Sequence, residues 1–502
     1  MQAYRFFGVA LLAAAISGSA QTTPSGNRAL ALDECFQIAL QHNLDVQIQR
    51  INPEIARYNL SMAYGGYDPT FNFSANQSYV RSEQGRSLSV FQPPANESWT
   101  EMFSAGIGGK LPTGTLYDVG GDVRRNSGFA SDNTGVLRDV GFDYSSGIAI
   151  NLTQPLLKNG WIDQTRMTIQ INKKTLKTTD LALAYQIMNT LTLVEQAYYD
   201  LIFARENVKV QQQALQLADR LLAENKKRVE VGAMAPLDEK QAESQAAVSR
   251  SDLLSSQNLL SVAQNALKRQ LSDEFNQWQD VNVDPTVKLT AIPVAFNRGD
   301  SWQKGLTQRP DLQQMRIDLE KQDIQLRYAR NQMYPQLDLK GSYGRNGVAA
   351  QFGGTLDDIA VARNPNFSFG GVMSIPIGNR SARNNVKIIR AQKQQSLLQL
   401  KKFEQDIMVQ IDDAVNQART SLERVEATRQ ARAYAEAALN AEQKKLENGK
   451  STSFVVLSLQ RNLTSARSEE IRALTEYNRA LAQLALAEGS TLDRNRIKLE
   501  IK

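Results

Sequence analysis

Residues 194–232 of the chain read VEQAYYDLIFARENVKVQQQALQLADRLLAENKKRVEVG. Apolar residues recur in this run at steps of seven, with glutamine, lysine, arginine and glutamate between them. Such a repeat is typical of a coiled-coil seam, in which side chains of one helix insert between those of its neighbour. We therefore expect a long, water-exposed helix whose seam contains Val194, Leu201, Val208, Leu215, Leu222 and Val229.

The run belongs to one of two long helical arms. Residues 161–231 contain no glycine or proline, and neither do residues 379–448. At 1.5 Å per residue, either arm would be roughly 100 Å long if fully helical. Basic residues precede Gly232 and Gly449, the pattern of a helix C-terminus followed by a left-handed glycine. Because a second helical run begins a few residues after each glycine, we expect two antiparallel helical hairpins.

The two halves of the chain align with each other. The hairpins align without gaps when Gly232 is placed on Gly449, and upstream of them Pro69 aligns with Pro335. This self-similarity indicates an internal duplication. Proline at position 53 predicts a kink in the first upstream helix. The expected division is a first repeat at 21–271 (helix 31–66, β segments 70–154, hairpin 161–271), an equatorial connection at 272–305, a second repeat at 306–488 (helix 306–333, β segments 336–377, hairpin 379–488) and a tail at 489–502.

Between the helices the pattern changes to a period of two. Phe71, Phe73 and Tyr79 alternate with Asn72 and Ser74, which predicts strands with one apolar and one polar face. Strands of about ten residues with aromatic ends suit the wall of an outer-membrane barrel, and a soluble β-sandwich is the alternative. The longer first insert predicts six strands per chain, with a four-stranded wall plus a folded surface loop as the competing interpretation. A loop is expected between the two strands of the second insert.

The N-terminus has the plan of a secretory signal peptide. Arg5 precedes an apolar run at residues 6–16, and small residues lead to a cleavage point expected after Ala20. No later stretch reaches the roughly 20 apolar residues of a membrane helix, so we expect an exported chain without transmembrane helices. Cys35 lies fifteen residues beyond the expected cleavage point and is interpreted as a small apolar residue on a helix face.

The composition excludes several classes of function. The chain has 1 His and 1 Cys, too few for a His/Cys metal site or a disulfide, and it shows no clustered catalytic set. We therefore expect no enzyme activity, no cofactor and no metal. The net charge of +6 arises from 58 basic and 52 acidic residues spread along the chain, which predicts no nucleic-acid partner.

Together these features resemble the TolC-type outer-membrane efflux proteins, also called outer membrane factors. The resemblance rests on the signal peptide, the unit of helix, strands and long hairpin used twice, and the motif at residues 228–232 followed by Asp238. It implies an α+β membrane protein, a homotrimer whose strands form one β-barrel in outer-membrane lipid and whose coiled-coil hairpins form a periplasmic tunnel. The implied role is passive conduction of substrates delivered by an inner-membrane pump and a periplasmic adaptor (membrane fusion protein), in tripartite efflux or type I secretion.

The resemblance also assigns roles to the hairpin tips. It implies adaptor docking at Val231, Gly232, Ala233, Asn448, Gly449, Lys450 and Ser451, which would be helix C-caps in any case. In the family, acidic residues often line the tunnel entrance six and nine positions after the second tip glycine. Those positions here are Val455 and Ser458; after the first tip glycine they are Asp238 and Gln241. Three copies of Asp238 could form a weaker anionic ring, or Asp238 could only favour the start of its helix.

Two other classes of protein remain as alternatives. A non-transport coiled-coil structural protein of the cell envelope would not need strands that close a barrel. General porins lack helical runs of 70 residues, which counts against that class.

Overall fold

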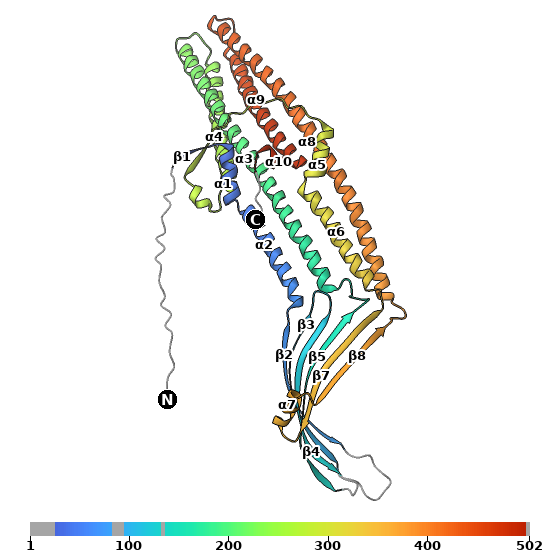
Figure 1. The fold of residues 1–502 in the computed structure, drawn as a ribbon. Helices are drawn as coiled ribbons and strands as arrows, with labels where there is room; N and C mark the ends of the chain where they lie inside the picture. Colours follow the sequence, from blue (N-terminus) through green and yellow to red (C-terminus); the bar gives the residue numbers. More distant parts are fainter. Residues whose placement is uncertain (1–25, 83–94, 132–135, 498–502) are drawn as a thin grey trace, which may run out of the picture. The chain divides into compact units, whose positions relative to one another are not determined.

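A computed structural model describes residues 26–82, 95–131 and 136–497. The predicted signal peptide lies outside these ranges. The chain forms two compact units, each assembled from segments distant in sequence. The first contains the described residues up to Gln47 with 187–296 and 414–486, and the second contains 48–186, 297–413 and the described residues from 487 onwards. Two long helices, α3 (Gln164–Glu230) and α8 (Arg380–Glu447), contribute to both units (Figure 1).

The first unit is a helical assembly. It contains α1 (Leu32–His42), α4 (Pro236–Leu271) and most of α9 (Ser453–Glu488). It also contains α3 from residue 187 onwards and α8 from residue 414 onwards. A two-stranded parallel sheet of β1 (Gly26–Leu30) and β6 (Val281–Pro285) packs beside α3, where the hydroxyl of Tyr198 donates to the carbonyl of Leu30 at 2.9 Å. The sequence predicted only a connection at 272–305. Burial of both Val281 and Val283 on alternate positions explains the additional strand.

The seam of α3 follows the predicted heptads over only part of its length. Val194, Leu201 and Val208 are buried, whereas Leu215 and Leu222 are half-buried. Beyond position 208 the buried line runs through Ala218, Leu221 and Asn225 instead. A straight helix of 3.6 residues per turn drifts away from a strict seven-residue repeat, so the inward-facing positions change along so long a helix.

The second unit contains a six-stranded antiparallel sheet in the order β2-β3-β4-β5-β7-β8 (Figure 1). The six strands per chain predicted from the sequence are confirmed, and β4 pairs with both of its neighbours. The helices of this unit are α2 (Leu44–Tyr64), α5 (Arg298–Gln308), α6 (Pro310–Asn331), α7 (Phe352–Ala360) and α10 (Thr491–Arg494). The unit also contains α3 up to residue 186 and α8 up to residue 413. The strands are β2 (Thr70–Ser82), β3 (Asn96–Lys110), β4 (Leu116–Ser131), β5 (Leu137–Pro155), β7 (Gln336–Ala349) and β8 (Asn364–Ser374).

Two local differences from the sequence-based expectations have clear causes. In place of one helix over 31–66, α1 and α2 are separated at Asn43, whose side-chain oxygen accepts the backbone N–H groups of Asp45 and Val46. This is an N-cap, and α2 then continues through Pro53. In place of a loop between β7 and β8, residues 352–360 form α7, because Thr355 is fully buried against the sheet.

The two faces of the sheet differ in chemistry, as the alternation predicted. One row of facing residues crosses all six strands and is apolar throughout: Phe71, Ile107, Val119, Ile150, Tyr343 and Phe367. The neighbouring row on the opposite face contains Asn72, Gly106, Gly120, Ala149, Gly344 and Asn366. The side chains of the apolar row are exposed in the single chain, from 39% at Val119 to 85% at Phe367.

The sheet is fixed to α3 by an ion cluster. The carboxylate of Asp163 accepts the Nε of Arg166 at 2.9 Å and pairs with Lys110 at 3.0 Å, while Arg166 also donates to the carbonyl of Thr113 in the β3–β4 turn. Burial alone would raise the pKa of Asp163, but the hydrogen bonds from Arg166 and Lys110 lower it overall. The carboxylate therefore stays ionised and holds the turn against the start of the helix.

No helix among the described residues is both long enough and apolar enough to cross a membrane. Cys35 is fully buried, and burial raises the pKa of its thiol to about 12. It therefore behaves as the small apolar residue that the sequence predicted.

Candidate functional site at the hairpin tips

The first hairpin tip joins α3 to α4. The amide of Gly232 donates to the carbonyl of Val229 at 3.0 Å, and the amide of Ala233 donates to the carbonyl of Arg228 at 2.8 Å. Gly232 has φ +73°, the left-handed conformation in which a side chain is strained. Pro236 then occupies the first turn of α4, where its missing N–H costs no helical hydrogen bond. Val231 is 77% exposed.

The second tip joins α8 to α9 with the same backbone pattern. Gly449 donates to Leu446 at 3.1 Å and has φ +71°, and Lys450 donates to Lys445 at 2.8 Å. These are the bonds of the first tip shifted by 217 residues. Asn448 adds a side-chain bond to the carbonyl of Lys444 at 2.8 Å. Each tip is therefore a glycine-terminated helix end, as the sequence predicted.

Side chains close the two tips differently. At the first, Asn225 is 1% exposed, and its amide nitrogen donates to the backbone carbonyl of Asp238 at 3.3 Å. Its side-chain oxygen accepts the hydroxyl of Ser453, the first residue of α9, at 3.1 Å. At the second tip, Glu442 occupies the position equivalent to Asn225 and accepts the hydroxyl of Ser451 at 2.6 Å. Asn225 therefore links the two hairpins, whereas Glu442 bonds within its own.

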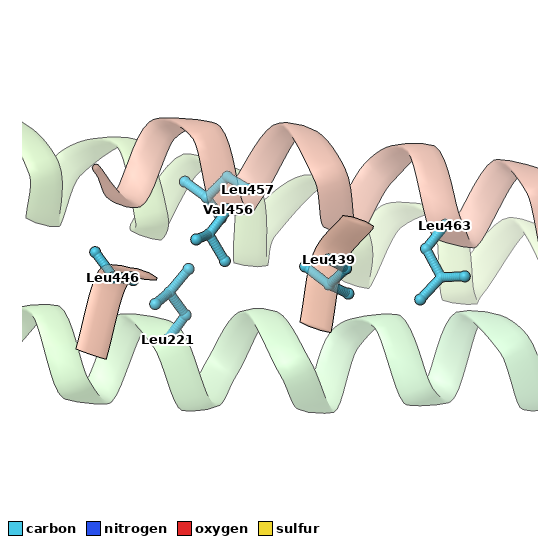
Figure 2. Packing of buried hydrophobic residues seen from close by; sticks show 6 residues of the cluster. All are labelled: Leu221, Leu439, Leu446, Val456, Leu457 and Leu463. Carbon is cyan, nitrogen blue, oxygen red and sulfur yellow. The ribbon is translucent and has the colours of Figure 1, made fainter. Parts of the chain in front are cut away.

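An apolar cluster lies beside this polar link. Figure 2 shows side chains from α3, α8 and α9 directed toward one another between the helices. Burial of these side chains holds the two hairpins together near their tips. The cluster consists of Leu221, Leu439, Leu446, Val456, Leu457 and Leu463.

The four predicted entrance residues lie in the first two turns of α4 and α9. Asp238 and Gln241 are half-buried on α4, and Asp238 lies near the positive end of the helix dipole. Ser458 is half-buried and Val455 is 39% exposed on α9. The carboxylate of the first hairpin thus has an apolar equivalent in the second. The separate roles suggested for these residues stay predictions.

Sequence reasoning missed Asn225, Ser453 and Glu442. One signal was present: Asn225 follows Ala218 and Leu221 at helical spacing, so a polar residue lies on an otherwise apolar line. Its partner could not be identified because Ser453 is 228 residues away in the sequence.

No group of three or more His, Cys, Asp or Glu side chains suited to a metal ion is present in the described part of the chain.

The family model described as outer membrane efflux protein matches residues 122–272 and 302–490, more than half of the chain. The chain belongs to the outer membrane efflux protein family. The family is one of outer-membrane channels and not of enzymes, and the resemblance stated from the sequence is confirmed. No curated protein matches the chain.

Solved structures of outer-membrane channels share the fold. The CmeC outer membrane channel of Campylobacter jejuni is 17% identical, with a TM-score of 0.66 over 94% of this efflux protein and 90% of CmeC. VceC from Vibrio cholerae is 17% identical, with a TM-score of 0.63 over 91% and 96% of the two chains. MtrE of Neisseria gonorrhoeae, solved in an open state, is 16% identical, with a TM-score of 0.63 over 92% and 89%. At these identities the likeness establishes the mixed helix and sheet fold.

Proposed function

We propose that this efflux family member is the outer-membrane channel of a tripartite efflux or type I secretion system. Three copies form one β-barrel in the outer membrane and one helical tunnel in the periplasm. Substrates delivered by an inner-membrane pump and a periplasmic adaptor pass through without chemistry in this subunit. The single observation that carries the proposal is the six-stranded sheet, which has two open edges and one apolar face.

The open edges favour closure with further copies. β2 and β8 each pair on one side only in the described sheet. Unpaired backbone groups are too costly in lipid, so the sheet must close. Six strands from each of three copies give eighteen, a number that encloses a water-filled channel rather than a packed interior. The apolar row from Phe71 to Phe367 would face lipid, and the row from Asn72 to Asn366 would face water.

A helical surface in the same unit supports self-association. Five large apolar side chains on α2 are at least 50% exposed in the single chain, and they follow the three-and-four spacing of a coiled-coil seam. A stripe of this kind on a long helix is suited to packing against a helix of another copy. It consists of Ile48, Ile51, Ile55, Tyr58 and Met62.

The recurrence of the elements supports an internal duplication. α2, the strands β2 to β5 and the pair α3–α4 have the same order as α6, the strands β7 and β8 and the pair α8–α9. Three copies then supply twelve helices in six hairpins, enough to surround a tunnel with alternating hairpins of two kinds.

The hairpin tips suit adaptor docking and gating. Residues 231–233 and 448–450 form exposed, glycine-centred turns, and Ser451 is half-buried. Opening of the entrance would be a change between two packings of the same helices, driven by the adaptor and pump. Asp238 supplies the one carboxylate among the four entrance positions, so the entrance is only weakly anionic.

Disulfide cross-linking tests the barrel. Asn72→Cys on β2 would be combined in turn with Asn364→Cys, Asn366→Cys and Ser368→Cys on β8. Within one chain these positions are five strand spacings apart, roughly 24 Å, too far for a disulfide. Cross-links can therefore form only between copies. The control pairs Asn72→Cys with Ala149→Cys on the interior strand β5.

The proposal predicts a covalent trimer on a non-reducing gel for at least one β8 position, with nothing larger, and no product for the control. Monomers in every edge pair, or a ladder extending beyond three copies, would contradict closure by three chains.

A further inference from the structure

Helix α7 is held on the apolar face of the sheet. A Cβ added to Gly347 of β7 would lie 2.1 Å from the carbonyl oxygen of Thr355, so this glycine permits the helix backbone to approach the strand. Thr355 is fully buried there. The ring of Phe352 lies 6.4 Å from the ring of Tyr144 on β5, and Arg345 donates to the carbonyl of Ile359 at 3.4 Å. The helix is therefore fixed to β5 and β7 at both of its ends.

Part of the surface of α7 is apolar and exposed. Phe352 and Leu356 are each 46% exposed, and Val361, directly after the helix, is 68% exposed. Phe352 and Leu356 are four residues apart, so they lie on one face of the helix. Asp358 also belongs to this helix but pairs with Arg363 at 3.1 Å. The helix thus presents apolar side chains next to this ion pair and the exposed Asp357.

The position of α7 coincides with a change in the chemistry of the sheet face. The all-apolar row crosses β7 at Tyr343, and α7 covers β7 near Gly347, roughly 13 Å further along the strand. The row that crosses β7 at Ala349 contains Arg125 and Glu101, which pair at 3.3 Å. α7 therefore lies where the first charged pair interrupts the apolar rows of this face. It sits beside the ends of β7 and β8 that lie away from the long helices, and β4 and β5 continue past it (Figure 1).

From this placement we propose that α7 is an interfacial helix that binds the surface of the outer leaflet through Phe352, Leu356 and Val361. The inference rests on the proposed barrel. A lipid surface fits better than a second copy, because α7 is seated on β5 and β7, whereas copies would join at the sheet edges β2 and β8. Apolar side chains at the boundary between acyl chains and headgroups fix the depth of the protein in the membrane.

Spin labels on single cysteines test this. The labelled variants are Leu356→Cys and Val361→Cys, with Asp357→Cys as the adjacent polar control. Phe367→Cys in the apolar row provides the lipid benchmark, and Val231→Cys at a hairpin tip provides the aqueous benchmark. Cys35 is fully buried, so the unsubstituted chain serves as the unlabelled blank. The full-length protein would be reconstituted in vesicles of dioleoyl phosphatidylethanolamine and dioleoyl phosphatidylglycerol.

The measurement is the ratio of collisions with oxygen to collisions with a water-soluble nickel chelate. We expect the ratio at positions 356 and 361 to be shifted from the Val231 value toward the Phe367 value. The ratio at Asp357 should be lower than the ratios at 356 and 361. Ratios at 356 and 361 equal to that at Val231 would overturn the inference, provided that Phe367 reports lipid. If Phe367 itself reports water, the proposed barrel fails instead. Val361 lies outside the helix, so it remains informative if a label at 356 disturbs α7.

Discussion

The two hairpin tips have the same backbone conformation and different side-chain hydrogen bonds. Their glycines have φ +73° and +71°, and the hydrogen bonds around them match residue for residue. Yet Asn225 is buried and reaches the other hairpin, whereas its equivalent Glu442 bonds Ser451 within its own turn. The two tips thus combine one glycine-centred chain path with two different sets of side-chain contacts. Side chains determine whether one hairpin is coupled to the other.

The largest effect is expected from removing the buried link. Asn225→Ala would leave the hydroxyl of Ser453 and the carbonyl of Asp238 without this partner inside the packed tips. An unsatisfied buried polar group costs about 1–3 kcal/mol. We expect faster hydrogen exchange of amides in both tips, because the link joins both hairpins.

The matched control is Glu442→Ala, which removes the equivalent side chain from the second tip. We expect only amides near Ser451 to exchange faster. If each substitution accelerated exchange only in its own tip, and by a similar factor, Asn225 would not couple the hairpins.

Substituting the tip glycines tests the shared backbone. Gly232→Ala and Gly449→Ala should each destabilise the local turn by about 1–2 kcal/mol, since a side chain in the left-handed conformation is strained. No atom lies within 4 Å of either added Cβ, so no steric clash adds to this cost. Exchange of the tip amides should increase by a similar factor in both variants. A large difference between them would mean that the tips are not equivalent in backbone energetics.

Exchanging the charge at the entrance sharpens the comparison further. Val455→Asp would place a carboxylate on the second hairpin at the position equivalent to Asp238, and Asp238→Val would remove the one that is present. In planar bilayers under a KCl gradient, we expect the reversal potential to move toward cation selectivity in the first variant. It should move away from cation selectivity in the second. Unchanged potentials in both would place these residues away from the permeation path.

The smallest effect is expected from acidification. The hydrogen bonds from Ser451 and Lys445 lower the pKa of Glu442. A carboxyl whose folded pKa is below its unfolded value of about 4.3 stabilises the fold above that pH, and the contribution is lost as pH falls through the folded pKa. Between about pH 5 and pH 3, amides of the second tip near Ser451 should therefore lose protection. The Asn225–Ser453 link contains no titrating group, so amides protected by that link should respond less. An identical loss of protection at the two tips would argue against the Glu442–Ser451 and Asn225–Ser453 hydrogen bonds as the contacts that stabilise them.

Much of the fold followed from local sequence signals. Long glycine-free and proline-free runs marked α3 and α8, Gly232 and Gly449 marked the tips, and alternation marked the strands. What escaped prediction depends on contacts between distant residues. β6 exists because Val281 and Val283 are buried beside β1, and α7 exists because Thr355 packs on Gly347. The partner of Asn225 lies in the other hairpin, and no local pattern encodes such a pairing.

The central claim, that three copies of this chain form a conducting channel, is tested most directly by single-channel recording. The purified full-length protein, and the Asn225→Ala variant with loosened tips, would be inserted into planar lipid bilayers. The account predicts discrete, uniform conductance steps, with longer or larger openings for the variant. A folded, detergent-extracted trimer that inserts but gives no conductance, either alone, with its adaptor or with loosened tips, would contradict it.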